Sequence, residues 1–393
     1  MKKVLIASPV VCSPAYSGNS VRIKQFVNAL HEKGIEVYFV LFSIREIADR
    51  KQANHMESEF GEKFYFLNEG HKIKGTLINR ALNYFKRLGL NKTKFGQDTV
   101  LPWSIFTNET LNEFSNIVDL VKPDLVIGEY ALSAPLIKYL NGKYPTAIDT
   151  HDCFTLRNKK IRQSKGVGLW WSLSEKQERD LLSCFDTVIA IQESEKVFFT
   201  KLLDKKVTKV TKIDVLELPG EWGSKVEQSI PAIGFIGSNN AHNREGLAKF
   251  INLHWLHILK KIPNAKLLIA GDVEVETSLS GVTVLGRVDS LYLDFYSKCS
   301  ITVNPCGSGS GLKIKTIESM SYGVPIITTK EGLSGIEQAI GEGAYCCDLD
   351  QDEFFLTCLD VLASKNLPSE GVKARKFIEL CKAESMNKIE ELF

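Results

Sequence analysis

One pattern limits the fold more than any other: a short apolar run, a loop, an amphipathic helix and a second apolar run, found in both halves of the chain. In the N-terminal half, residues 4–7 and 36–42 are the apolar runs, and apolar side chains at helical spacing lie between them. Ser20 is predicted to begin this helix as its N-cap, and Gly34 to end it in a left-handed conformation. Unbroken apolar runs are typical of parallel strands covered on both faces, so we predict a right-handed βαβ unit.

The same order returns in the C-terminal half. Residues 232–237 and 266–270 are predicted strands, and the helix between them follows a loop at 239–243. We therefore predict an α/β chain with two Rossmann-like domains, each built on a doubly wound parallel sheet. The predicted parts are an N-terminal domain at 1–216, a polar linker at 217–231, a C-terminal domain at 232–370 and a helical tail at 371–393.

Composition excludes several other classes of protein. Hydrophobic residues make up 44% and charged residues 24% of the 393 residues, as in globular proteins and unlike disordered or fibrous ones. The 49 Lys and Arg against 47 Asp and Glu leave a net charge of +2, so no overall basic excess predicts a nucleic-acid partner. The nine cysteines form no Cys-x-x-Cys pair, which argues against a zinc site or a disulfide framework and indicates a reducing compartment.

Membrane association is predicted to be peripheral at most. No apolar run approaches the ~18 residues that a spanning helix needs, so we expect a cytoplasmic chain. Residues 70–97 are basic, contain no acidic residue and carry apolar side chains at helical spacing. This stretch is either a solvated helix packed on the N-terminal domain or a surface that meets anionic lipid at the inner face of a membrane. The sequence leaves both interpretations open.

The segment 301–329 carries the clearest functional signal. A strand at 301–303 leads into a glycine-rich loop, and a helix follows that ends before the next strand at 325–328. Glycine lets the backbone approach a ligand closely, and a helix N-terminus offers free N–H groups and a partial positive charge. NAD and ATP are poor fits, because the loop after the first strand of the chain holds only Gly18 and the P-loop spacing is absent.

Two cations make this loop a candidate anion site. Lys313 and Lys315 fall in the first turn of the predicted helix, where positive charge opposes the helix dipole unless an anion neutralises it. The loop and the lysines therefore predict a phosphate or diphosphate site. The simpler alternative is a tight turn with surface lysines.

Residues 309–329, GSGLKIKTIESMSYGVPIITT, resemble the donor-binding motif of the retaining GT-B glycosyltransferases of family 4, the glycosyl transferases group 1 set. Pieces upstream, around Gly237, His242, Pro263 and Gly286, occur in the order that this resemblance leads us to expect. The resemblance implies the GT-B fold, in which two Rossmann-like domains face each other across a cleft. It also implies transfer of a hexose-type sugar from a UDP- or GDP-sugar to an acceptor hydroxyl, with retention, without a metal and without any cofactor beyond the nucleotide-sugar substrate.

The resemblance assigns roles to individual residues. Glu318 matches the second glutamate of the family's E-x7-E motif and would accept hydrogen bonds from the ribose hydroxyls of the donor. The first glutamate of the motif falls at Ser310, so the usual contact with the transferred sugar is missing and the sugar stays open. Lys313 and Lys315 would bind the diphosphate, with Lys313 in a catalytic role. The other predicted donor-binding residues are Gly237, Arg244, Gly309, Gly311 and Leu312.

In the N-terminal half, a predicted strand ends at Asp149, just before His151 and Asp152. The carboxyl ends of parallel strands face the ligand crevice of doubly wound sheets. The resemblance implies a histidine on such a loop near the sugar and the acceptor, and we assign this role to His151. Asp152 would orient the imidazole or polarise the acceptor hydroxyl. The simpler alternative is a loop-capping aspartate beside an ordinary half-buried histidine.

The first loop of the chain resembles the acceptor-side loop of the same family, with Gly18, Asn19 and Arg22 as its candidate residues. The expected partners are therefore a nucleotide-sugar and a glycan or lipid-linked acceptor, in the synthesis of a bacterial surface polysaccharide or lipopolysaccharide. Two alternatives stay open. One is a GT-B-fold sugar-nucleotide epimerase, which would turn over donor without acceptor, and the other is a non-catalytic member that only binds nucleotide.

Overall fold

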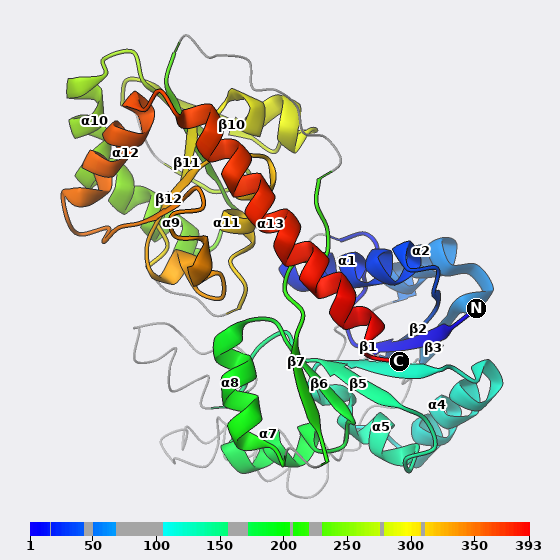
Figure 1. The fold of residues 1–393 in the computed structure, drawn as a ribbon. Helices are drawn as coiled ribbons and strands as arrows, with labels where there is room; N and C mark the ends of the chain where they lie inside the picture. The colour runs from blue at the N-terminus through cyan, green and yellow to red at the C-terminus, as the bar shows by residue number, and fades with distance from the viewer. Residues whose placement is uncertain are drawn as a thin grey trace, which may run out of the picture. The chain divides into compact units, whose positions relative to one another are not determined.

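The computed structural model describes residues 1–15, 17–42, 50–67, 105–155, 172–204, 207–219, 230–275, 279–307 and 311–393. The basic stretch 70–97, Gly309, Ser310 and most of the predicted linker lie outside the described residues. The chain divides into two compact units (Figure 1). The N-terminal unit comprises Met1–Leu216 together with Met386–Phe393, and the C-terminal unit comprises Glu217–Ser385.

The N-terminal unit is built on a seven-stranded parallel sheet with the order β3-β2-β1-β4-β5-β6-β7. The strands are β1 (Lys3–Ser8), β2 (Glu36–Phe42), β3 (Phe64–Leu67), β4 (Leu125–Glu129), β5 (Thr146–Asp149), β6 (Thr187–Ala190) and β7 (Lys209–Lys212). The predicted strands at 4–7 and 36–42 are confirmed. The strand order reverses between β1 and β4, and ligands bind at such a switch point in doubly wound sheets.

Helices cover both faces of this sheet, because successive side chains of a strand point to opposite sides. Val4 and Ile6 of β1 pack in a core with α1 (Gly18–Glu32) and α2 (Arg50–Phe60). Leu5 and Ala7 pack in a second core on the other face. The helices of that face are α4 (Asn108–Val121), α5 (Ala134–Tyr139), α7 (Glu175–Leu182) and α8 (Glu193–Leu202).

The first helix begins earlier than its sequence predicts. Ser17, not Ser20, is the N-cap of α1, and Ser20 lies at the third helical position, where its hydroxyl accepts from the backbone N–H of Ser17 at 3.0 Å. Ser17 and Ser20 are both residues that commonly cap the start of a helix, and the sequence pattern favoured Ser20. The C-terminal prediction is confirmed, since Gly34 has a φ of +69°.

The C-terminal unit repeats this architecture with a six-stranded parallel sheet of order β10-β9-β8-β11-β12-β13. The strands are β8 (Ala232–Ile236), β9 (Lys266–Ala270), β10 (Val282–Gly286), β11 (Ile301–Asn304), β12 (Ile326–Thr328) and β13 (Ala344–Cys346). The predicted pair of doubly wound domains is therefore confirmed. The switch point of this sheet lies between β8 and β11.

The helices of the C-terminal unit are α9 (Ala241–Phe250), α10 (Leu256–Lys261), α11 (Ile314–Ser321) and α12 (Glu353–Ala363), with a π-helical turn at Ile251–Trp255 between α9 and α10. The predicted loop at 239–243 is too long by three residues. Helix α9 starts at Ala241 because the Asn240 side chain accepts from the Asn243 N–H at 2.9 Å and caps it.

A single long helix, α13 (Leu367–Glu390), accounts for most of the predicted C-terminal tail. Ala374 and Ile378 are buried, and Ser385 is the last residue of the C-terminal unit. Met386, Ile389 and Leu392 then belong to the same core of the N-terminal unit as β1 and α1. Of the helices in the described ranges, none combines the length and the apolar character needed to cross a bilayer.

Candidate functional site

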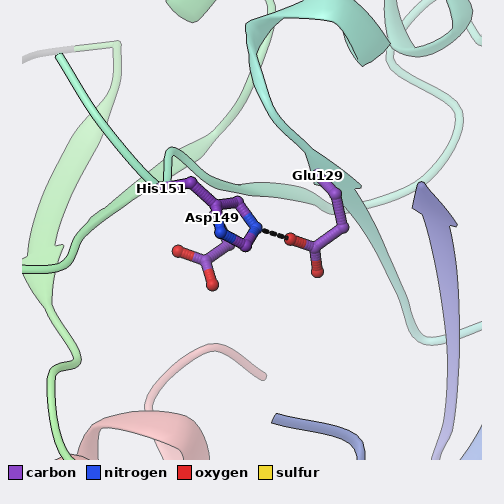
Figure 2. Close-up of side chains that lie close together, drawn as sticks. All are labelled: Glu129, Asp149 and His151. Carbon is purple, nitrogen blue, oxygen red and sulfur yellow. Dashed lines mark hydrogen bonds and ion pairs between the residues drawn. The ribbon is translucent and has the colours of Figure 1, made fainter. Parts of the chain in front are cut away.

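The N-terminal unit gathers ionisable side chains where β4 and β5 end. Glu129 and Asp149 are the last residues of these neighbouring strands and lie opposite each other in the register. His151 follows two residues after Asp149, and the three side chains lie close together (Figure 2). Glu129 and Asp149 are fully buried, and His151 is nearly so.

Arg22 of α1 neutralises Asp149. Its Nε lies 2.8 Å from Asp149 Oδ2 and its Nη2 lies 3.0 Å from Oδ1, so the guanidinium and the carboxylate meet through two parallel bonds. The guanidinium also donates to the backbone carbonyls of Ile213 and Asp214. Gly18 and Asn19 lie within α1 together with Arg22, and not in a loop before the helix as predicted, because the helix begins at Gly18.

The imidazole of His151 is held on its edge and on its face. Its Nε2 lies 2.5 Å from Glu129 Oε2, and the Tyr130 ring stacks on it with the ring centroids 4.2 Å apart and an interplanar angle of 12°. Tyr130 and His151 both have positive φ angles, +64° and +59°, which non-glycine residues rarely adopt and which cluster at functional sites.

The imidazole contacts the carboxylate of Glu129 and not that of Asp152. The Asp152 carboxylate instead accepts from the backbone N–H of Cys153 at 2.9 Å. The contact with the imidazole that was predicted for Asp152 is therefore made by Glu129. The other role, polarising an acceptor hydroxyl, stays a prediction.

Burial dominates the electrostatics of this edge. It raises the pKa of the Glu129 carboxyl, and the charge of Asp149 adds to the rise, while His151 and Arg22 oppose it. Burial, together with the charge of Asp152, also raises the pKa of Glu195 in the first turn of α8 to about 7. Within the described residues, Oε1 of Glu129 is buried without a hydrogen-bond partner.

Glu129, Asp149 and His151 each place one potential metal ligand within 4.8 Å of the others. Both oxygens of Asp149 are already bonded to the Arg22 guanidinium. A metal ion here would displace that cation or meet its positive charge. The arrangement therefore fits a network of two acid–base pairs better than a metal centre.

In the C-terminal unit, the switch point between β8 and β11 brings together Gly237, α9 and the start of α11. The Lys315 ammonium lies 4.8 Å from the centroid of the Phe235 ring and donates to the side-chain oxygen of Asn243. Among the described residues it meets no carboxylate within ion-pair distance. Burial lowers the pKa of Lys315 from 10.5 to about 8.

Glu318 lies one turn further along α11 and is held by a tyrosine. The buried Tyr296 hydroxyl donates to Glu318 Oε2 at 2.9 Å, and the Tyr296 ring stacks on Tyr322 at 4.5 Å between centroids. Burial raises the pKa of Glu318, while the Tyr296 hydrogen bond and the Lys315 charge oppose that rise. The carboxylate is thus oriented by one donor and has capacity for others.

The other predicted donor residues are placed as follows. Lys313 is the N-cap of α11, and its ammonium lies 3.3 Å from Glu331 Oε1. Gly311 has a φ of +78°, which leaves this position to glycine, and Leu312 follows it directly. Arg244 lies within α9, not in a loop, and donates to the Asn239 side chain at 2.7 Å.

Glu129, Asn304 and Tyr296 are among the residues of these sites that were not predicted. Glu129 ends an apolar run, Leu-Val-Ile-Gly-Glu, so an acid at the carboxyl end of a buried strand was a readable signal. Asn304 ends β11 in the same way, and its amide donates to Thr316 of α11 at 3.1 Å. Tyr296 had no local signal, because its partner Glu318 is 22 residues away in sequence.

Residues 230–364 match the family model of glycosyl transferases group 1. This match contains Gly237, Asn243, Lys315 and Glu318, so the whole C-terminal candidate site lies inside it. The Glu129–His151 site lies outside it. A search of curated proteins finds no sequence that matches this chain.

Solved structures resemble the whole chain at low sequence identity. A sucrose-phosphate synthase from Thermosynechococcus elongatus is 14% identical with a TM-score of 0.61, over 100% of this chain and 98% of that chain. HepE of Anabaena in complex with UDP is 12% identical with a TM-score of 0.62, over 100% and 99%. TarM of S. aureus, in complex with fondaparinux, α-GlcNAc-glycerol and UDP, is 13% identical with a TM-score of 0.62, over 100% and 99%. The predicted GT-B fold is confirmed.

Proposed function

We propose that this chain is a retaining glycosyltransferase of family 4 that moves a hexose-type sugar from a UDP- or GDP-sugar to an acceptor hydroxyl. The observation that carries the proposal is Lys315, a half-buried ammonium at the start of α11 that contacts an aromatic ring and an amide and, among the described residues, forms no ion pair with a carboxylate. A bound diphosphate would supply the missing negative charge, and the N–H groups of the α11 N-terminus would add donors to it.

The C-terminal unit is proposed to bind the nucleotide. Glu318 accepts the two ribose hydroxyls, and Tyr296 keeps its carboxylate in place. Lys313 and Lys315 bind the diphosphate beside the backbone of Gly237 and Gly311. Gly309, Ser310, Leu312 and Arg244 complete the proposed donor site.

In the reaction, the bond from the anomeric carbon to the diphosphate oxygen breaks and a bond to the acceptor oxygen forms. The acceptor hydroxyl gives up its proton, and the departing nucleoside diphosphate accepts it. The negative charge that develops on the leaving group is stabilised by Lys313, Lys315 and the helix N-terminus. These groups supply the positive charge that a metal supplies elsewhere, so the proposed mechanism uses no metal and no further cofactor.

The N-terminal unit is proposed to bind the acceptor. His151 is the proposed catalytic group near the acceptor hydroxyl, with Asp152 beside it, and Gly18 and Asn19 at the start of α1 are proposed to contact the acceptor. HepE binds UDP, and TarM binds UDP and α-GlcNAc-glycerol, which supports a UDP-sugar and a glycan or lipid-linked acceptor for this chain.

Isothermal titration tests the donor site. Wild type, Glu318→Ala and the control Glu353→Ala are titrated with UDP, GDP and ADP, where Glu353 is an exposed glutamate on α12. We expect micromolar binding of one nucleotide, lost in Glu318→Ala and kept in the control. No binding of any of the three to wild type would overturn the proposal.

Turnover assays then separate the alternatives. Lys313→Ala should lower turnover more than it changes folding, and unchanged kinetics would remove Lys313 from the mechanism. Donor turnover in the absence of acceptor would instead identify a sugar-nucleotide epimerase. Nucleotide binding without release of a nucleoside diphosphate under any acceptor would identify a non-catalytic binding protein.

We further propose that the protein works in the cytoplasm, at the inner face of a membrane, in the synthesis of a surface polysaccharide or lipopolysaccharide. The basic, acid-free composition of residues 70–97 supports this placement. Flotation of the full chain with anionic and with neutral liposomes tests it. We expect salt-sensitive binding to the anionic vesicles only, and equal absence from both would remove the membrane from the proposal.

A further inference from the structure

The end of β4 is shaped to present one carboxylate to one imidazole. Gly128 lies so close to Ser133 that a Cβ there would come within 2.2 Å of the Ser133 hydroxyl oxygen. That hydroxyl in turn donates to the Tyr130 carbonyl at 2.8 Å. These contacts fix the backbone on both sides of Glu129 and hold Tyr130 at its positive φ, where its ring covers the face of His151.

A second buried glutamate in the same unit shows what a purely structural carboxylate looks like. Glu178 of α7 accepts from the backbone N–H groups of Phe154 and Thr155, both at 2.8 Å, and from the Thr155 hydroxyl. Both of its oxygens are used to hold backbone. Glu129 holds no backbone group in the described residues: Oε2 meets His151, and Oε1 meets no donor.

The contact with Glu129 also distinguishes the two ring nitrogens of His151. Nε2 faces the carboxylate, and no hydrogen bond to Nδ1 is found in the part of the chain described. When one nitrogen of a neutral imidazole donates to a carboxylate, the other is left as an acceptor. With the proton on Nε2, that acceptor would be Nδ1.

We propose that Glu129 is the positioning residue for His151, fixing the proton on Nε2 so that Nδ1 accepts the hydrogen bond of a substrate hydroxyl. This inference rests on the proposed glycosyl transfer and goes beyond it, by naming the atom of His151 that meets the substrate and the residue that sets it. The Tyr130 ring keeps the imidazole plane in place. Arg22 neutralises Asp149, the carboxylate next to Glu129 in the sheet. Glu129 itself touches no substrate.

The proton position is measured on the whole chain, independently of sugar transfer. The chain contains seven histidines, so selective ¹⁵N-histidine labelling gives few signals, and His151→Gln identifies the resonance of His151. We compare wild type with Glu129→Leu, which removes the acceptor, and Glu129→Gln, whose amide oxygen still accepts. Glu178→Gln is the matched control, a buried glutamate of the same unit.

We expect His151 to carry its proton on Nε2 in wild type, in Glu129→Gln and in Glu178→Gln. In Glu129→Leu we expect a mixture of both tautomers. An unchanged ratio of tautomers in Glu129→Leu would overturn the proposal, whether or not any sugar transfer is detected. Failure of nucleotide binding would by contrast remove the proposed function and leave this result standing.

Kinetics give the second readout. Glu129→Leu should lower kcat by about 100-fold, because the imidazole loses its fixed orientation as well as its fixed proton position, with KM for the donor changed by less than about threefold. Glu129→Gln should recover most of this loss, and Glu178→Gln should lower thermal stability with kcat retained. Equal losses of kcat in Glu129→Leu and Glu178→Gln would mark Glu129 as structural and overturn the proposal.

Discussion

In the N-terminal unit the Arg22 guanidinium binds Asp149 and two backbone carbonyls, whereas in the C-terminal unit the Lys315 ammonium lies between an aromatic ring and an amide. Both cations sit at the carboxyl edge of a doubly wound sheet, next to its switch point. The first is neutralised inside the protein, so its surroundings are fixed before any ligand arrives. The second forms no ion pair with a carboxylate in the part of the chain that the structure describes, and the proposed anion site rests on this arrangement. The same architecture therefore holds a neutralised ion pair in one unit and a proposed anion site in the other.

The largest expected effect comes from breaking the neutralised pair. Arg22→Met leaves Asp149 buried and charged without a partner, which typically costs about 3–5 kcal/mol of the free energy of unfolding. Hydrogen exchange at the amides of β1, β4 and β5 reports this free energy for the N-terminal unit separately.

Lys24→Met is the control for this variant. Lys24 lies on the same helix and pairs with Glu59, but both side chains are partly exposed, so a loss below about 1 kcal/mol is expected. Equal losses of the free energy of unfolding in the two variants would mean that the buried Arg22–Asp149 pair stabilises the unit no more than the partly exposed Lys24–Glu59 pair does.

Removing the unneutralised cation should act on binding and not on folding. Lys315→Met should weaken the binding of the preferred nucleoside diphosphate by about 10- to 100-fold, because one charge-assisted contact contributes about 1.5–3 kcal/mol. The thermal stability should stay the same or rise, since a half-buried ammonium is replaced by an apolar chain. Titration calorimetry and thermal unfolding are the two measurements.

Lys266→Met is the matched control, because Lys266 is an exposed lysine at the amino end of β9. Its nucleotide affinity should equal that of wild type. A loss of stability without a loss of affinity in Lys315→Met would contradict the view that Lys315 serves binding while Arg22 serves folding.

The titration of the Lys315 ammonium gives a further test of the difference between the two cations. Its pKa of about 8 in the folded chain lies below the ordinary 10.5, so the unfolded chain binds more protons between these values. The contribution of Lys315 to stability therefore rises as pH rises from about 8 to 10.5. Nucleotide affinity should fall over the same interval, because the ammonium loses its charge. In Lys315→Arg the affinity should stay level, and a parallel decline there would assign the titration to another group.

The smallest effect is expected at the carboxylate of the donor site. Tyr296→Phe removes the hydroxyl that orients Glu318, and a single hydrogen bond of this kind contributes about 1 kcal/mol. Nucleotide affinity should drop by roughly fivefold, measured by titration calorimetry. Tyr292→Phe is the control, since the Tyr292 ring stacks on Tyr322 and its hydroxyl makes no hydrogen bond within the described ranges. A drop of the same size in both variants would remove Tyr296 from the site.

The fold was readable from the sequence because its signals are local. An apolar run such as residues 36–42 shows a buried strand directly, and Gly34 and Gly323 mark helix ends through their positive φ angles. The errors are local too. Ser17 and Ser20 both suit a helix start, and only the hydrogen bond between them shows which one caps α1.

The sites were readable only where their residues lie within one segment. Lys313, Lys315 and Glu318 fall on one short helix, so their spacing alone brings them together. Glu129 and His151 are 22 residues apart and meet because β4 and β5 pair side by side with their ends aligned. The sequence therefore points to Asp152, the neighbour of His151 in the chain, whereas the pairing of β4 with β5 brings Glu129 to the imidazole.

Helix α13 has a consequence for how the protein is made. Met386, Ile389 and Leu392 share a core with Val4 and Ile6, so a strand made before the C-terminal unit packs against residues made after it. Contacts this distant in sequence form late, since the chain between them must first be present. The N-terminal unit therefore cannot complete its core when residue 216 has been synthesised. Its last layer arrives after the other unit, and the emerging chain must keep part of an apolar surface uncovered until then.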